Sequence, residues 1–257
     1  MPEPAKPVPA STLLLVRDGE AGLEVLLLTR HAASGFAAGA LVFPGGKIDP
    51  ADEGLFPGDP PPHPPAAFWV GAIRETFEEC GVLLARRGGS LLDAAEVAAL
   101  PREAAHDASA FSRLLASERL ELATDLLVPF AHWITPPDSP KRFDTHFFVA
   151  PVPPEQRPAP DGHETTGLLW TSPEELVEAA KAGRANLVFA TRMNLLRLGR
   201  SRTAAEALEA ARRSKIVTVC PEIIEKPEGK FLRIPEEAGY GGSEFSAAGI
   251  QRAWKPS

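Results

Sequence analysis

The stretch AAFWVGAIRETFEECGVLL, residues 66–84, decides how this chain folds. When it is placed on a helix at about 100° per residue, its apolar side chains fall in one narrow sector. That sector holds Ala66, Trp69, Ile73, Phe77 and Cys80. Glu75, Glu78 and Glu79 fall on the opposite side, because residues three and four apart share a helix face. The stretch is therefore predicted to be a helix with one face for a core and one face of carboxylates.

The three carboxylates have two interpretations, a solvated acidic surface and a cation site. Like charges at this spacing repel each other, and they lie near the helix end that the macrodipole makes negative. A glycine turn, Gly45-Gly46, precedes the helix and allows backbone to approach a ligand closely. Ligands that are all oxygen are typical of Mg²⁺ or Mn²⁺ rather than zinc. The sequence favours the cation site.

The composition excludes several classes of protein. The 257 residues carry a net charge of −7, and no Lys/Arg block is long enough for a nucleic-acid patch. The two cysteines have neither metal-ligand nor disulfide spacing, which is typical of a reducing compartment. The N-terminus lacks the apolar core of a signal peptide, and no window approaches a membrane span. We expect a cytoplasmic protein that binds neither nucleic acid nor membrane, and a homodimer remains open.

The rest of the chain is typical of an α+β protein, with a mixed sheet and helices on its faces. We expect a disordered, Pro-rich segment at 1–10, a main domain at 11–200, and a C-terminal helix with short strands at 201–257 that pack on it. Strands are predicted at 11–17, 24–30, 41–43, 125–136, 142–151, 168–170 and, as two short strands, within 215–235. Further helices are predicted at 90–100, 102–118 and 187–199, and after the capping boxes that begin at Ser172 and Thr203. Within 90–118 we expect helix without strand.

Two segments together resemble the Nudix box. Gly46 is followed after five residues by Asp52, and residues 74–82 read RETFEECGV. The second segment matches the family signature at every fixed position except the first apolar one, where Thr76 stands. The first segment departs twice, because Asp52 replaces a Glu and the spacer at 53–73 has 21 residues where seven are usual.

The long spacer, the PGG turn and the phrase RFDTHFFVA at 142–150 are similar to one branch of the family. That branch contains the peroxisomal coenzyme A diphosphatases, and the similarity runs from about residue 11 to 200. The resemblance implies a Nudix-type α/β/α sandwich with extra helices. We expect the Pro-rich insertion at 53–65 to be a surface excursion near the mouth of the site.

The resemblance also implies a magnesium-dependent (or manganese-dependent) hydrolase acting on a small nucleotide. The implied metal ligands are Glu75, Glu78, Glu79 and a backbone carbonyl of Gly45 or Gly46. Arg74 would orient the cluster by pairing with Asp52. Either Glu79 or Glu164 would accept the proton of the attacking water.

The substrate implied by the resemblance is a nucleoside diphosphate linked to another group, with coenzyme A or an acyl-coenzyme A preferred. A 3′-phosphate needs a cationic partner, and Arg30 and Arg142 are first choices because Arg binds phosphate bidentately. Lys47 in the glycine turn is a further candidate. Gly35 stands where some relatives carry an Arg, which leaves a broad-specificity hydrolase of ADP-ribose, NADH and nucleotide sugars as the alternative. A non-catalytic Nudix-like binding domain is a second alternative.

Overall fold

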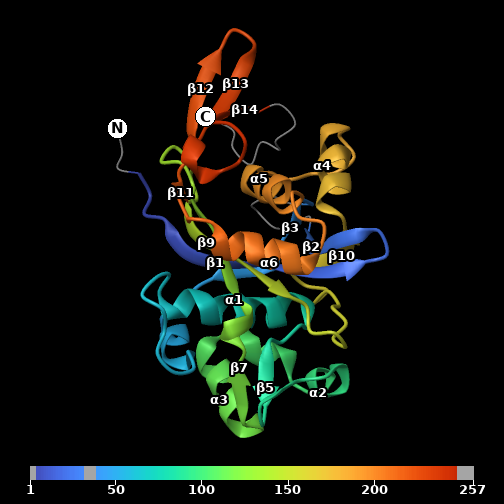
Figure 1. Ribbon diagram of the computed structural model, residues 1–257. Helices are drawn as coiled ribbons and strands as arrows, with labels where there is room; N and C mark the ends of the chain where they lie inside the picture. Colours follow the sequence, from blue (N-terminus) through green and yellow to red (C-terminus); the bar gives the residue numbers. More distant parts are fainter. Residues whose placement is uncertain (1–3, 32–38, 248–257) are drawn as a thin grey trace.

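A mixed sheet forms the centre of the molecule (Figure 1). The computed structural model describes residues 4–31 and 39–247. Within them the sheet has eight strands, in the order β10-β2-β1-β9-β8-β11, with β3 on β2 and β4 on β1. β1 runs parallel to β9 and antiparallel to β2. The strands are β1 (Val8–Gly19), β2 (Gly22–Arg30), β3 (Leu41–Val42), β4 (Gly45–Lys47), β8 (Val128–Ile134), β9 (Phe143–Pro151), β10 (Thr165–Thr171) and β11 (Thr218–Val219).

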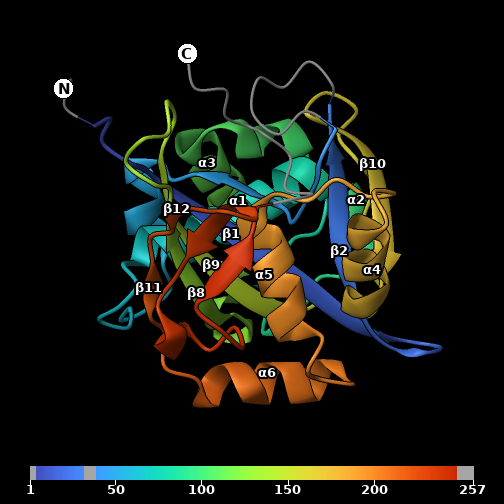
Figure 2. The same cartoon turned by 90° about the horizontal axis from the view of Figure 1, so that it is seen from above.

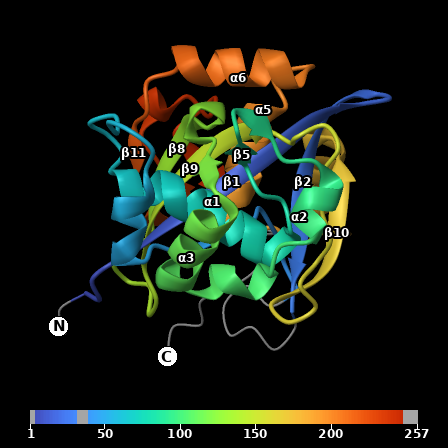
Figure 3. The same cartoon turned by 90° about the horizontal axis from the view of Figure 1, so that it is seen from below.

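One face of the sheet packs against α1 (Ala66–Cys80), which is central in the view from below (Figure 3). Alternate side chains of β1 and β9, including Leu13, Leu15 and Phe148, meet Ile73 and Phe77 of α1 in a buried core. Further elements extend this layer. They are η1 (Pro50–Leu55), β5 (Ala85–Arg87), β6 (Ser90–Leu91), α2 (Ala94–Ala98), η2 (Arg102–His106), α3 (Ala108–Glu118), β7 (Leu120–Leu122) and η3 (Thr124–Leu126).

The other core is closed by α4 (Pro173–Lys181), α5 (Phe189–Leu198) and α6 (Ala204–Arg213). Figure 2 shows α5 across the strands and α6 beside the sheet. Leu14, Val16 and Phe147 point into this second core. Both predicted capping boxes place a hydroxyl where expected, since Ser172 and Thr203 accept from the backbone N–H three residues on. The C-terminal part adds a small sheet of β12 (Glu222–Lys226), β13 (Gly229–Arg233) and β14 (Glu244–Ser246), with η4 (Glu236–Ala238) between. The predicted α/β/α sandwich is confirmed.

Several boundaries differ from the sequence prediction. The helix predicted at 66–84 ends at Cys80, because Gly81 adopts a left-handed φ of 69° and donates its N–H to the Phe77 carbonyl. The prediction of helix without strand at 90–118 was wrong, since β6 lies within it and pairs with β5, whose other neighbour is β7. β1 begins at Val8, so residues 8–10 belong to the sheet rather than to a disordered N-terminus. Among the described residues, no helix is long and apolar enough to cross a membrane.

Candidate active site

The glycine turn and the carboxylate helix are brought together by β4. It pairs antiparallel with Ala10–Thr12 of β1, which lays the backbone of Gly45 and Gly46 against α1. The Gly45 N–H donates to Glu79 Oε2 at 2.8 Å. A Cβ at Gly46 would collide with the Glu75 carboxylate, and Gly45 has a φ of 154°, which disfavours other residues. Both glycines are therefore required by the close approach of the backbone to the acidic face.

Glu75 and Glu79 carry their charges in poorly solvated surroundings. Glu79 is only 4% exposed, and burial raises its pKa to about 8 although the Gly45 N–H opposes the shift. Burial also raises the pKa of Glu75 to about 7, against the effect of Arg74 and together with repulsion from Glu78. The interpretation as a solvated acidic surface is thus inconsistent with the structure. The protein partners do not stabilise the charged forms of these two carboxylates fully, which is what a cation would do.

Arg74 connects the carboxylates to the strand side of the site. Its Nε and Nη2 bind the two oxygens of Asp52 at 2.9 and 3.1 Å, and its Nη1 lies 3.0 Å from Glu75 Oε1. Nη2 also donates to the Lys47 carbonyl and Nη1 to the Ala105 carbonyl, both at 3.0 Å. Burial works against the guanidinium charge, but the bond to Asp52 and the neighbouring carboxylates raise the pKa of Arg74 overall. The predicted pairing of Arg74 with Asp52 is present and bidentate.

Asp52 reaches Arg74 although it is one methylene shorter than the usual Glu. It is fully buried in η1, where Asp49 and Asp52 form a reciprocal capping box. Gly71 of α1 makes room for it, since a Cβ there would approach Asp52 Oδ2 to 3.3 Å and Ile48 Cδ1 to 2.6 Å. The shorter side chain is therefore accommodated by close packing of η1 on α1.

Glu78 occupies the solvent side of the cluster. Its Oε1 lies 2.5 Å from His106 Nδ1, and this hydrogen bond raises the pKa of His106. Its Oε2 lies 3.6 Å from Arg74 Nη1, and its backbone carbonyl accepts from Arg102 Nε at 2.6 Å. His106 comes from the helical segment after α1, and the scattered histidines of the sequence gave no sign of this contact.

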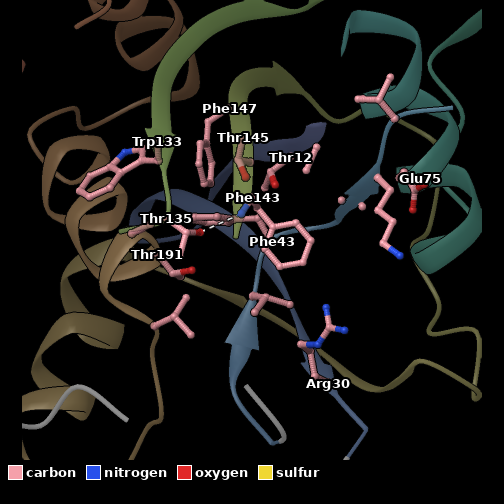
Figure 4. A pocket seen from close by; sticks show the side chains of 18 of the residues that line it. Thr12, Arg30, Phe43, Glu75, Trp133, Thr135, Phe143, Thr145, Phe147 and Thr191 are labelled. Atoms are coloured by element: carbon pink, nitrogen blue, oxygen red, sulfur yellow. Dashed lines mark hydrogen bonds between the residues drawn. The ribbon is translucent and has the colours of Figure 1, made fainter. Parts of the chain in front are cut away.

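The three glutamates line one end of a cavity of about 1040 Å³. Figure 4 shows Glu75 at one side of this cavity and Trp133 at the other, with Phe43 and Phe143 between them. The far end is largely apolar, and its lining includes Trp133, Phe147, Val188, Phe189 and Leu232. The cavity therefore offers an acidic end for cation-bound phosphate and an aromatic end for a flat or apolar group. The C-terminal segment contributes Pro221 and Leu232 to the lining, which the sequence did not reveal.

The basic residues predicted to bind substrate do not all reach the cavity. Arg30 and Lys47 line it, and so does Lys141. Arg30 Nε is buried without a hydrogen-bond partner among the described residues. Arg142 is not part of the lining, because its Nε donates to the Thr135 carbonyl and its Nη1 to the Ala5 carbonyl. Its place in the fold does not support a role in phosphate binding.

Glu164 also lines the cavity, at the end where the glutamate cluster lies. It precedes β10 in a turn whose backbone N–H groups at 163–165 donate to Asp161 Oδ1. Its carbonyl accepts from the His31 N–H at 2.9 Å, which ties the turn to the end of β2. Its exposed carboxylate is close enough to Glu79 to raise the pKa of that group slightly.

The insertion at 53–65 lies elsewhere than expected. None of these residues lines the cavity, so the prediction that the insertion borders the site was wrong. It leads from η1 to the start of α1, on the α1 side of the sheet. Gly35, where some relatives carry an Arg, lies outside the described residues.

The comparisons with known proteins agree with the geometry. The family model of the NUDT19 Nudix domain matches residues 58–198. The chain is 31% identical to the acyl-coenzyme A diphosphatase NUDT19 of Gallus gallus over 222 residues, which are 64% of this chain and 58% of that protein. It is 31% identical to the human protein of the same name over 231 residues, 68% of this chain and 58% of that protein. The chain thus spans little more than half the length of these relatives.

A solved structure resembles the chain over most of its length. The crystal structure of a NUDIX hydrolase from Alicyclobacillus acidocaldarius superposes with a TM-score of 0.70 at 30% sequence identity. The match covers 80% of this chain and 96% of the other. The match therefore includes almost all of the other protein.

Proposed function

Because this chain belongs to the family of the NUDT19 Nudix domain, we propose that it hydrolyses a diphosphate bond with the help of a divalent cation. The observation that carries the proposal is the arrangement at one end of the cavity. Three carboxylates of α1 lie there against the glycine turn, with a buried arginine beneath them. A diphosphate at this end would be repelled by the carboxylates unless a cation lay between them.

Glu75, Glu78 and Glu79, with a backbone carbonyl of Gly46, would hold Mg²⁺ or Mn²⁺. The donor set fits such an ion, because it consists of oxygen atoms alone and the crowded carboxylates lose their protons readily only when a cation is near. When bound, the ion would neutralise diphosphate oxygens and make a water molecule more acidic. Arg74 is a positioning residue, since it fixes Glu75 from below and is itself fixed by Asp52 and two carbonyls.

Two carboxylates can accept the proton of the attacking water. Glu79 is buried and already accepts a hydrogen bond from the Gly45 N–H, while Glu164 is exposed at the cavity wall. The pair Glu79→Gln and Glu164→Gln separates the two roles. Loss of the base alone lowers kcat and changes its pH profile while cation binding remains, whereas loss of a ligand weakens the response to Mg²⁺ as well.

The proposed substrate is coenzyme A or an acyl-coenzyme A, cut to a phosphopantetheine product and adenosine 3′,5′-bisphosphate. The names of the two NUDT19 relatives support this class. In the cavity, Arg30, Lys47 and Lys141 provide cations for phosphate groups, and the aromatic end suits an adenine ring or an apolar chain. The unpartnered Arg30 Nε makes Arg30 the first choice for the 3′-phosphate.

A substrate panel tests this assignment. kcat/KM would be compared for coenzyme A, its 3′-dephospho form, ADP-ribose and NADH at saturating Mg²⁺. We expect coenzyme A to be the best of the four, and Arg30→Gln to reduce its advantage over the dephospho form. Equal turnover of coenzyme A and the dephospho form would exclude a 3′-phosphate site. A preference for ADP-ribose or NADH would favour the broad-specificity alternative.

A further inference from the structure

A second cluster of potential metal ligands lies on the opposite face of β8 and β9 from the cavity. One ligand atom from each of His132, Asp144 and His146 lies within 4.8 Å of the others. His132 and His146 are direct cross-strand partners, and Asp144 is two residues from His146 and so shares its face. The alternate residues Trp133 and Thr145 point the other way, into the cavity lining.

The cluster is part of a polar row that crosses four strands on the face packed against α1. In register order the row runs from Ser11 on β1 through His146 and His132 to Thr218 on β11. Further along β1 and β9, most of the side chains that face α1 are leucine, phenylalanine or alanine. The Ser11 hydroxyl is fully buried and has no hydrogen-bond partner among the described residues. A buried hydroxyl without a protein partner calls for a further group beside it, such as a water molecule or an ion.

His132 and Asp144 are already in direct contact in the cluster. His132 Nε2 lies 2.6 Å from Asp144 Oδ1, which is a hydrogen-bond distance, so a bound ion would take the place of the shared proton and move the two atoms apart. The other ring nitrogen, Nδ1, lies 2.8 Å from Thr218 Oγ1. A partner on the second nitrogen is what orients most metal-binding histidines.

The insertion brings a third histidine to the pair. The His63 ring lies with its centroid 5.2 Å from that of His146 and 6.5 Å from that of His132. Phe68, in the first turn of α1, packs edge-on against His146 at 4.6 Å. His63 is exposed, whereas His132 and His146 are buried, so His63 forms the solvent side of the cluster.

We propose that His63, His132, Asp144 and His146 bind a transition-metal ion of the zinc class. Three imidazoles and a carboxylate are a common tetrahedral set for zinc, and nitrogen ligands distinguish the site from the oxygen-only cluster on α1. The rings of His132 and His146 are stacked, with centroids 3.9 Å apart and planes at 8°. Binding therefore tilts the two rings so that their nitrogens point to one ion. The ion would fasten the insertion to the sheet, and it would play no part in hydrolysis.

Cobalt is the probe for this site, because nitrogen-rich tetrahedral Co²⁺ absorbs visible light far more strongly than oxygen-bound octahedral Co²⁺. Tag-free, chelator-treated protein would be titrated with Co²⁺, and Zn²⁺ affinity would be measured by competition. We expect a tetrahedral spectrum, displaced by one equivalent of Zn²⁺, and a higher Tm with Zn²⁺. His146→Gln should weaken Zn²⁺ binding more than about 100-fold and His63→Ala about tenfold.

Two control variants make the result specific. Glu79→Gln, in the other cluster, should keep the tetrahedral spectrum. His163→Gln, at a histidine remote from the row, should keep it as well. His63 is exposed, so its variant should fold even where a buried substitution does not. A wild-type protein without a tetrahedral spectrum would overturn the proposal. So would a His63→Ala variant that binds Zn²⁺ as tightly as the wild type.

Discussion

Replacing Arg74 by glutamine should destabilise the protein far more than the loss of an ordinary ion pair. The substitution leaves Asp52, which is fully buried, without its bidentate partner, and it removes donors from two backbone carbonyls. Removing one partner of a buried pair costs about 3–5 kcal/mol, because the remaining charge stays buried and uncompensated. We expect a loss of that size in the free energy of unfolding.

The chain provides a control at its surface. Arg86 also binds an aspartate bidentately, with Nη1 and Nη2 donating to the two oxygens of Asp125 at 2.5 and 2.9 Å. The side chains of this second pair are 26% and 63% exposed, against 3% for Arg74 and 0% for Asp52. Arg86→Gln should therefore cost at most about 1 kcal/mol. The comparison sets a buried pair against an exposed one, although Arg74 binds through Nε and Nη2 and Arg86 through its two Nη atoms.

Urea unfolding of the metal-free protein, followed by tryptophan fluorescence, measures both losses. Asp52→Asn should cost less than Arg74→Gln, because Arg74 keeps Glu75 and two carbonyls as partners. The double variant should lose less than the sum of the single losses, since the two residues interact directly. If Arg74→Gln and Arg86→Gln destabilised the protein equally, the buried pair would not support the site as described.

Three further predictions follow from the site. Burial raises the pKa of Glu75 to about 7 and that of Glu79 to about 8, from an ordinary 4.5. At a pH between the ordinary and the raised values, the folded metal-free protein therefore binds more protons than the unfolded chain. Its stability should therefore fall as pH rises from about 5 to 8, and Glu79→Gln should flatten the dependence of Tm on pH measured in EDTA. Mg²⁺ affinity should rise over the same interval, because the ion displaces protons; a calorimetric titration that found no proton release at pH 7 would contradict this. Arg30→Gln should raise the KM for coenzyme A about tenfold or more, because one charged hydrogen bond to the substrate is lost. Arg142→Gln should leave KM unchanged, because Arg142 donates to the carbonyls of Thr135 and Ala5 instead.

The sequence predicted the elements that depend on local patterns. The apolar sector of 66–80 identified α1 and its buried side, and the Ser172 and Thr203 capping boxes identified two helix starts. The pairing of Arg74 with Asp52 came from the resemblance to the Nudix box. In each case the information lies within a few residues or in a fixed spacing.

What the sequence missed depends on contacts between distant segments. β5 and β6 pair through the tight turn at Gly88-Gly89, but β7 joins the sheet only after α3. These strands are too short and too far apart in the sequence to show an alternation of apolar and polar residues. Helix periodicity placed Glu79 away from the apolar sector, yet the residue is buried because β4 covers it. The histidine cluster arises from strand register, and an insertion brings His63 to it.

The central claim is that Glu78 and Glu79 hold the cation that diphosphate hydrolysis requires. The most direct test measures turnover of coenzyme A against Mg²⁺ concentration for the wild type, Glu78→Gln and Glu79→Gln, with Tm recorded for each protein with and without Mg²⁺. We predict Mg²⁺-dependent turnover and a Tm increase with Mg²⁺ in the wild type. In both variants most of the turnover and of the Mg²⁺ response should be lost, although the metal-free proteins remain folded. Turnover by either variant at the wild-type rate, together with a wild-type Tm that Mg²⁺ does not change, would contradict the account.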